Sequence, residues 1–367
     1  MYSQNDLDEA VAAGALSAEA AASLRSFVDL QRASPAVDEE HFRLITGFND
    51  IFVAIAGAIL LFAVGWIGQS IGQSLGFVID FDGPSPIAPA LIAATAWGLA
   101  LFFTGKRRMA LPSILLLLAF VGAVFAASAL TIGLIIGAAF FESNEPAIGI
   151  VVSVAAGIAA AAAWLHWRRF RVPITIAAGA AAAVGVGLGL LAYAVGGSAN
   201  RDNILLSFVL LLGVGVFLFA MRWDSSDPAR VTRRSDVAFW LHLLAAPMIV
   251  HPVFTLLGLN DGTATIGEGL IVIALYVAIG LTALAIDRRA LLVSALAYVL
   301  YALSELFKQF GAVELSIALT ALIIGSALLL LSAFWHQARS VVVTKLPEAL
   351  QAKLPYLDRV PIALPAA

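Results

Sequence analysis

Long runs of apolar residues alternate with short polar turns along most of this chain. Each run reaches or approaches the roughly 20 residues that a helix needs to cross the hydrocarbon layer of a membrane. Ten runs can be drawn, at residues 50–70, 86–105, 110–141, 146–167, 172–197, 203–222, 236–258, 266–286, 290–312 and 314–335. The pattern predicts an all-α fold, a polytopic membrane bundle of about ten transmembrane helices over residues 45–336.

The third run is longer than one crossing requires. Its ~30 residues would extend ~45 Å as a straight helix, so this helix must tilt, protrude or break. We expect the weakest part between Ser128 and Gly133. Because no polar turn divides the run, it counts as one span, and the even number of spans places both termini on the same side.

The basic residues predict the orientation of the bundle. Of the 21 Lys and Arg residues, 19 precede the first run, follow the last, or lie in the turns after the second, fourth, sixth and eighth runs. Basic segments stay in the cytoplasm because Lys and Arg translocate poorly. The excess of Arg over Lys and the abundance of Ala are typical of GC-rich bacteria. We therefore expect a bacterial inner (plasma) membrane protein with both termini cytoplasmic.

Composition excludes several classes of protein. A chain that is 61% hydrophobic and 12% charged, with a mean hydropathy of +0.97, is too apolar for a soluble domain. A net charge of −3, with the cations confined to short turns, excludes a nucleic-acid-binding protein. Without cysteine there is no disulfide, thiolate or Cys metal site. We predict no metal and no cofactor; the lipid bilayer is the expected surrounding, and a homo-oligomer stays open.

The polar residues 1–44 precede the first span. Apolar residues at helical spacing predict a short helix that Gly14 ends and a second helix that Ser17 caps. The prediction is a small cytoplasmic helical hairpin and linker, which offers a docking site for a cytoplasmic protein partner.

Residues 337–367 form an amphipathic tail that we also expect in the cytoplasm. Pro347 can open a helix there and Pro355 can stop it. One apolar face would carry Leu346, Leu350, Leu354 and Leu357. This face can lie in the headgroup layer, or it can pack against the cytoplasmic loops or the N-terminal hairpin.

Three segments resemble a bacterial family of multi-span membrane proteins, domain of unknown function 2157. The segment Asp6–Leu24, with Ala-Gly-Ala-Leu-Ser-Ala-Glu at its centre, is similar to the N-terminal helical hairpin of that family. Arg43–Ile55 resembles its entry to the first span, and Asp236-Val-Ala-Phe-Trp-Leu-His resembles a segment of related proteins. The resemblance implies a multi-span bacterial inner-membrane protein and brings no catalytic residues.

Two acidic residues in the first outer loop, Asp80 and Asp82, are the strongest candidates for catalysis. Membrane enzymes that use lipid-linked substrates often place a carboxylate in this position; the alternative is a solvated Asp-Gly-Pro turn. The sequence contains no Gly-x-Ser-x-Gly, His-Glu-x-x-His or Walker motif, which counts against hydrolases, metalloproteases and ATP-driven pumps.

The ninth span carries a polar stripe at i, i+3, i+7 and i+10, made of Tyr298, Tyr301, Glu305 and Lys308. One interpretation is an interfacial Glu305–Lys308 pair near the outer surface. The other adds His251 and Glu268, which lie at a similar depth on the seventh and eighth spans, to form an outward-facing polar vestibule.

We interpret three histidines and one glycine pattern as parts of the structure and not of a functional site. His166 is expected to be a solvated residue at the inner interface. His242 and His251 point to opposite faces of an ideal helix and make a poor joint metal site. The Gly185-x-x-x-Gly189 spacing allows close helix contact, although so small a pattern is expected by chance in a helix rich in Gly and Ala.

These observations favour a non-enzymatic integral membrane protein that transports a solute, or that senses or scaffolds at the membrane. Polar residues inside spans are costly, which favours transport. The alternatives are a membrane enzyme acting on a lipid-linked substrate through Asp80 and Asp82, and a regulatory scaffold that docks through its hairpin. A polar cavity would favour transport, an outward carboxylate-lined groove the enzyme, and a solid bundle the scaffold.

Overall fold

The computed structural model describes residues 10–24, 48–79, 83–228, 230, 232–258, 266–309 and 315–357. Within these ranges the chain forms helices joined by turns, and no strand is present. The chain divides into two compact units, Met1–Leu44 and Ile45–Ala367. The predicted all-α fold is confirmed.

In the first unit, the described residues are helical at 10–12 and 18–24. Gly14 lies between the two segments with a φ of 71°, a conformation that glycine adopts without a clash from Cβ. The Ser17 hydroxyl accepts a hydrogen bond of 3.1 Å from the Ala20 backbone N–H and so caps the second segment. Both local predictions are confirmed, because each depends on residues close together in sequence.

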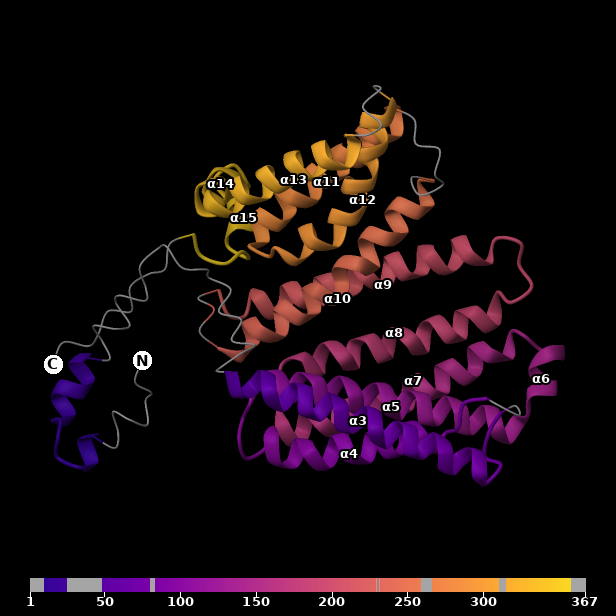
Figure 1. Ribbon diagram of the computed structural model, residues 1–367. Coiled ribbons are helices and arrows are strands. Elements are labelled where there is room, and N and C mark those ends of the chain that lie inside the picture. Colours follow the sequence, from indigo (N-terminus) through magenta and orange to yellow (C-terminus); the bar gives the residue numbers. More distant parts are fainter. Residues whose placement is uncertain are drawn as a thin grey trace. The chain divides into compact units, whose positions relative to one another are not determined.

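The second unit contains the spans that the apolar runs predict (Figure 1). In the described part of the chain, nine helices are long and apolar enough to cross a membrane, and α4 is slightly shorter at 17 residues. The protein is therefore a multi-pass integral membrane protein. The ten helices are α3 (Phe48–Ser74), α4 (Ile87–Phe103), α5 (Ala110–Ile136), α7 (Ala147–Phe170), α8 (Ile174–Ala194), α9 (Arg201–Asp224), α10 (Arg233–Leu256), α11 (Ile266–Ile286), α12 (Ala290–Gln309) and α13 (Ser316–Ala333).

The long third run breaks, but later than expected. The helix continues through Ser128 and Thr131, whose hydroxyls donate hydrogen bonds of 2.8 and 2.7 Å to carbonyls one turn back. The break falls at Gly137, whose φ of 88° and ψ of 148° suit glycine alone. The short helix α6 (Ala138–Ser143) follows. The sequence correctly predicted that a break can occur, and its predicted position was wrong.

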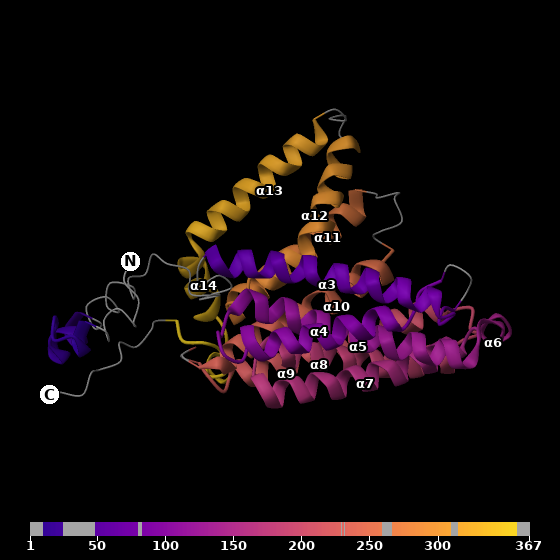
Figure 2. The ribbon, with the colours of Figure 1, turned by 60° about the horizontal axis from the view of Figure 1, so that its bottom comes forward.

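Consecutive helices pack as neighbours, with α4 against α5, α7 against α8, α9 against α10, and α11 against α12. Figure 1 shows the early helices on one side of this unit, α8 to α10 in its middle and α11 to α13 on the other side. Contacts of α5 with α7, and of α10 with α8 and α12, join these groups. Helix α13 packs beside α12, and Figure 2 shows the two helices diverging away from the C-terminal end of α12.

The α7–α8 interface is the closest helix pair that the glycines define. A Cβ on Gly189 would lie 2.5 Å from the carbonyl oxygen of Gly149 and 2.6 Å from the nitrogen of Ser153. A Cβ on Gly185 would lie 3.1 Å from that of Ala156. Both members of the Gly-x-x-x-Gly pair therefore face α7. Interpreting the spacing as a chance pattern was wrong, because only small residues allow the two backbones to come this close.

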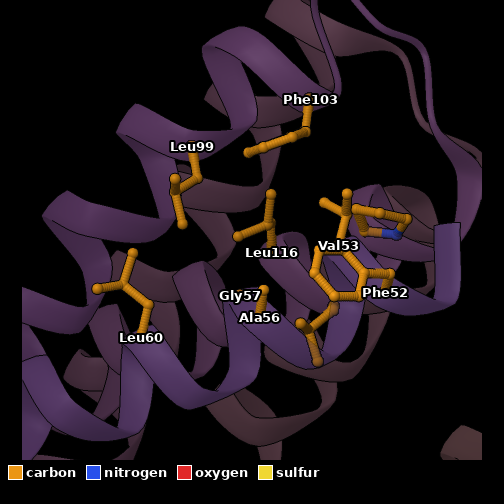
Figure 3. Close-up of a pocket in the computed structure, with 10 residues that line it drawn as sticks. Phe52, Val53, Ala56, Gly57, Leu60, Leu99, Phe103 and Leu116 are labelled. Carbon is orange, nitrogen blue, oxygen red and sulfur yellow. The ribbon is translucent and has the colours of Figure 1, made fainter. Parts of the chain in front are cut away.

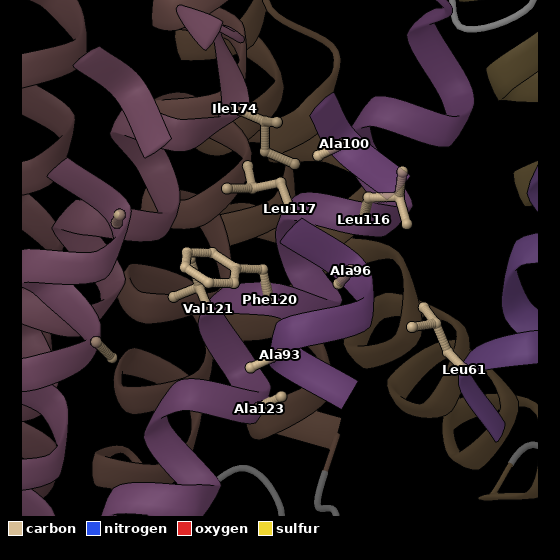
Figure 4. Packing of buried hydrophobic residues seen from close by; sticks show 12 residues of the cluster. Leu61, Ala93, Ala96, Ala100, Leu116, Leu117, Phe120, Val121, Ala123 and Ile174 are labelled. Atoms are coloured by element: carbon tan, nitrogen blue, oxygen red, sulfur yellow. The ribbon is translucent and has the colours of Figure 1, made fainter. Parts of the chain in front are cut away.

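The largest apolar core lies where α4, α5, α7 and α8 meet (Figure 4). The small residues Ala96 and Ala100 of α4 allow Leu117 and Phe120 of α5 to pack closely, and Ala96 and Leu117 are completely buried. The outward surface is also apolar; Trp66 of α3, for example, is 69% exposed. An apolar exterior is what the lipid bilayer requires of a membrane protein.

The C-terminal tail folds back onto the bundle. It contains α14 (Trp335–Val343) and α15 (Glu348–Gln351). Leu354 is buried in a cluster with Trp335 and Val343, against Ala283 of α11 and Leu291 of α12. Of the alternatives that the sequence left open, packing against the turns of the bundle is the arrangement observed.

Candidate functional site

The predicted polar residues of α10 and α12 meet as one pair. His251 Nδ1 lies 2.6 Å from the Tyr298 hydroxyl, and the Phe254 ring stacks on Tyr298 at 4.5 Å. Phe254 is completely buried and His251 is exposed. Tyr298 therefore packs its ring on a buried apolar residue and places its hydroxyl in a hydrogen bond with an exposed histidine.

The remaining predicted site residues are placed only in part. Glu268 lies half-buried in the first turn of α11, and Tyr301 and Lys308 are exposed on α12. Glu305 belongs to α12, but its side chain is outside the described structure, as are Asp80 and Asp82. The outward vestibule and the acidic outer-loop pair stay predictions.

A buried ionic network that the sequence interpretation did not predict lies at the other end of these helices. We call this the basic end; it carries the α4–α5, α7–α8, α9–α10 and α11–α12 turns. Asp224, the last residue of α9, accepts hydrogen bonds from Nε and Nη2 of Arg288 in the α11–α12 turn. His242 Nε2 of α10 lies 3.0 Å from the same carboxylate. All three side chains are at most 3% exposed.

A second ion pair continues the network. Arg230 Nη1 donates to Asp287 at 2.7 Å, and its Nη2 donates to the carbonyls of Ile286 and Asp287 at 3.0 and 3.1 Å. Arg230 and Asp287 have φ values of 53° and 57°, in the left-handed region that non-glycine residues rarely adopt. Arg108 and Arg171 in the two exposed basic turns share this conformation, so it belongs to the turns and not to the network alone.

The same network holds the tail. Trp335 Nε1 donates to Asp287 at 2.6 Å, and Arg339 Nε lies 3.9 Å from that carboxylate. Arg339 also donates to the carbonyls of Pro355 at 2.6 Å and Tyr356 at 3.1 Å, and it is 1% exposed. The tail therefore closes a loop around a buried guanidinium group.

Each aspartate of this network lies against arginine side chains. Burial alone would raise the pKa of Asp287, but Arg230, Arg339 and the hydrogen bond from Trp335 hold that pKa below its usual value. Burial lowers the pKa of Arg230, as does Arg288, yet arginine stays protonated at physiological pH. The arginines therefore face ionised aspartates and backbone carbonyls, which is the condition under which buried charges are tolerated.

A local turn supports this arrangement. The buried carboxylate of Asp227 accepts from the backbone N–H and the hydroxyl of Thr232, at 2.9 and 2.7 Å. The Thr232 hydroxyl in turn accepts from Arg234 N and caps α10. This cap fixes where α10 begins and therefore where His242 meets Asp224.

His166, expected at a solvated interface, is completely buried. Its Nδ1 lies 3.2 Å from the Thr175 hydroxyl of α8, and the rings of Trp97, Phe120 and Phe170 surround it. The prediction was wrong because Trp97 and Phe120, which are distant in sequence, help to enclose this histidine, although Arg168 and Arg169 follow it closely in the chain.

Two cavities are lined almost entirely by apolar side chains. The larger has a volume of about 290 Å³ and lies between α3, α4 and α5 (Figure 3). The smaller, of about 150 Å³, lies between α12 and α13, with Arg289 and Trp335 at one end. The larger is lined by Phe52, Val53, Ala56, Gly57, Leu60, Leu99, Phe103, Pro112, Leu115 and Leu116.

Within the described ranges, no group of three His, Asp or Glu side chains is placed to hold a metal ion. Comparison with protein-family models, with curated proteins and with solved structures found no match.

The sequence contained a signal for the network that its interpretation did not use. The α9–α10 segment contains Asp224 and Asp227, and the α11–α12 turn contains Asp287, whereas the cations at 106–108 and 168–171 have no acidic residue among them. Acids inside a basic turn indicate ion pairing, because positive-inside placement requires cations alone. The pairing across segments 64 residues apart, from Asp224 to Arg288, has no local signature.

Proposed function

We propose that this chain is a non-enzymatic scaffold or sensor of the bacterial plasma membrane, with its basic end and both termini in the cytoplasm. The partition of Lys and Arg supports this orientation. The resemblance to domain of unknown function 2157 supports the bacterial inner membrane. The N-terminal hairpin, a separate small unit ahead of the first span, is the proposed docking module.

The observation that carries the proposal is the buried network that ties the tail to two turns. It joins the end of α9, the α11–α12 turn and the tail through Asp224, Asp287 and Arg339. A fixed surface assembled from distant segments suits partner binding. Transport needs a polar path across the membrane, and the two cavities described above, with their apolar linings, do not supply one.

The test is photo-cross-linking in living cells. A photoreactive residue replaces Val341 or Tyr356, which are 55% and 58% exposed on the tail. Leu211, 65% exposed on α9, is the control within the membrane. The tail positions should give discrete protein adducts, and Leu211 should give lipid adducts.

Arg339→Ala should remove the tail adducts by releasing the tail, whereas Arg201→Ala, at the surface ion pair with Glu145, should leave them unchanged. Tail positions that cross-link no protein, in cells where the Leu211 control reacts with lipid, would rule out the scaffold.

Orientation has its own test. Single cysteines in this cysteine-free chain can be labelled with an impermeant maleimide in cells whose outer membrane is permeabilised. We expect labelling at position 202, which is exposed in the first helical turn of α9 at the end opposite the basic end, and none at Arg107. The reverse pattern would contradict the topology.

Solute transport is the second candidate, and the His251–Tyr298 hydrogen bond favours it because a titratable group inside a span is costly. Reconstituted proteoliposomes would then show a solute-driven current or pH change that His251→Phe abolishes. The enzyme alternative rests on Asp80 and Asp82, which the structure does not describe.

A further inference from the structure

The larger cavity opens onto the outer surface of the bundle. Its lining residues Phe52 and Leu60 of α3 are 64% and 43% exposed, while Leu116 of α5 at its base is 2% exposed. Figure 3 shows the side chains of α3 and α4 around this space, with Leu116 between them. An apolar cavity that opens toward lipid is suited to a hydrocarbon chain, because no polar group there would lose hydrogen bonds to water.

A cationic turn borders this cavity. Lys106, Arg107 and Arg108 join α4 to α5, and all three are exposed. Two lining residues, Phe103 and Pro112, lie on either side of the turn in the sequence. The hydrogen bond from Met109 N to Phe103 O, 3.1 Å long, holds the turn against the end of α4. The exposed cations are therefore only a few residues from the cavity lining on either side, in one hydrogen-bonded turn.

We infer that this site binds one anionic phospholipid of the adjoining leaflet. An acyl chain occupies the cavity between α3, α4 and α5, and the phosphate and anionic headgroup lie at Lys106 and Arg107. Clusters of Lys and Arg next to a span attract anionic lipids through charge. A zwitterionic lipid can fill the cavity, but its headgroup gains less from the cations. The inference holds for either orientation of the protein.

The chain offers a matched control for charge. The α7–α8 turn carries Arg168, Arg169 and Arg171, all exposed, and none of them adjoins a residue that lines the cavity. It also offers a matched control for volume. A Cβ on Gly57 meets only Leu115, at 3.7 Å, inside the cavity, whereas a Cβ on Gly98 of α4 meets nothing.

The experiment titrates the purified, delipidated full chain with phosphatidylglycerol or with phosphatidylcholine of the same acyl chains and counts bound lipids by native mass spectrometry. We expect wild type to bind one phosphatidylglycerol in preference to phosphatidylcholine. Replacing Lys106 and Arg107 with Gln should lower the affinity for phosphatidylglycerol roughly tenfold or more and leave the affinity for phosphatidylcholine nearly unchanged. Gly57→Leu should lower the affinity for both lipids, because its side chain fills part of the cavity.

Replacing Arg168 and Arg169 with Gln, and Gly98→Leu, should leave the first bound lipid unchanged. Equal losses from the two charge variants would show a general effect of charge and overturn the site. Unchanged binding in Gly57→Leu would overturn the acyl-chain position. Should Gly57→Leu fail to fold, Ala56→Leu fills the cavity from the same helix, and the same two outcomes apply to it.

Discussion

Two kinds of basic turn lie at the same end of this bundle. The α4–α5 and α7–α8 turns expose their cations, and Arg168 lies over the Trp164 ring of its own helix at 4.9 Å. The α9–α10 and α11–α12 turns instead bury Arg230 and Arg288, which are 9% and 3% exposed, against aspartates. Similar basic segments in the sequence thus occupy opposite environments.

The difference shows what decides whether a membrane-flanking cation is buried or exposed. An exposed cation needs no partner, since water and lipid phosphates satisfy it. A buried cation requires a carboxylate, and only the second kind of turn supplies one, in Asp224 and Asp287. A turn with both signs of charge can be covered by the tail; a turn with cations alone stays at the surface.

The largest expected effect breaks the buried pair. Arg288→Ala leaves the Asp224 carboxylate buried without its cation and should lower the free energy of unfolding by roughly 3–5 kcal/mol. The matched change at an exposed turn, Arg168→Ala, should stay within about 0.5 kcal/mol. Equilibrium unfolding in mixed micelles measures both.

Replacing Asp224 and Arg288 together with Leu should recover part of the loss, because no unpaired charge then remains. Equal effects of Arg288→Ala and Arg168→Ala would mean that the two kinds of turn do not differ energetically.

The next effect concerns the tail. Arg339→Ala removes the donors to Pro355 and Tyr356, each a charge-assisted hydrogen bond worth about 1.5–3 kcal/mol. We expect cleavage of the tail by added protease to become at least roughly tenfold faster, as a loss of more than 1.4 kcal/mol implies. The cleavage rate of Arg339→Lys should lie between those of wild type and Arg339→Ala. Unchanged cleavage would show that apolar contacts of Leu354 alone hold the tail.

The tail should also respond to acid. Since the pKa of Asp287 lies below its usual value, the folded state binds this proton less readily than the unfolded state. The stability from this carboxylate is therefore present above the ordinary aspartate pKa of about 3.9 and is lost as the pH falls through the lower folded value. Protection of the tail from cleavage by protease should stay constant from neutral pH to about 4 and decline below that pH.

Asp287→Asn should weaken that protection at neutral pH and reduce its dependence on acid, whereas Asp202→Asn, at an exposed position, should change neither. A decline that begins near pH 6 to 7 would instead implicate a histidine.

The smallest effect is expected at the predicted polar pair. Tyr298→Phe removes the hydroxyl that contacts His251 and keeps the ring that stacks on Phe254, so it should cost about 0.5–1.5 kcal/mol. Thermal unfolding in detergent measures this. A loss as large as that of Arg288→Ala would place a second strongly coupled polar site at the opposite end.

The sequence predicted most of the fold and little of the network. The apolar run at 172–197 predicted α8 closely, because a helix in lipid must satisfy every backbone group within its own segment. Gly14 and Ser17 defined their turn through local hydrogen bonds. The pairing of Asp224 with Arg288 could not be predicted, since it depends on which helices become neighbours.

What the sequence alone determined are the approximate number of spans, the ends of most of them and the end of the bundle at which the cations gather, because hydrophobicity, length and charge act on each segment separately. Tertiary structure alone decided which cations are buried. It brought His242 to Asp224, enclosed His166 in aromatic rings and closed the tail around Arg339. The physical reason is that the environment of a charge is set by the atoms packed around it, and these come from segments far apart in the chain.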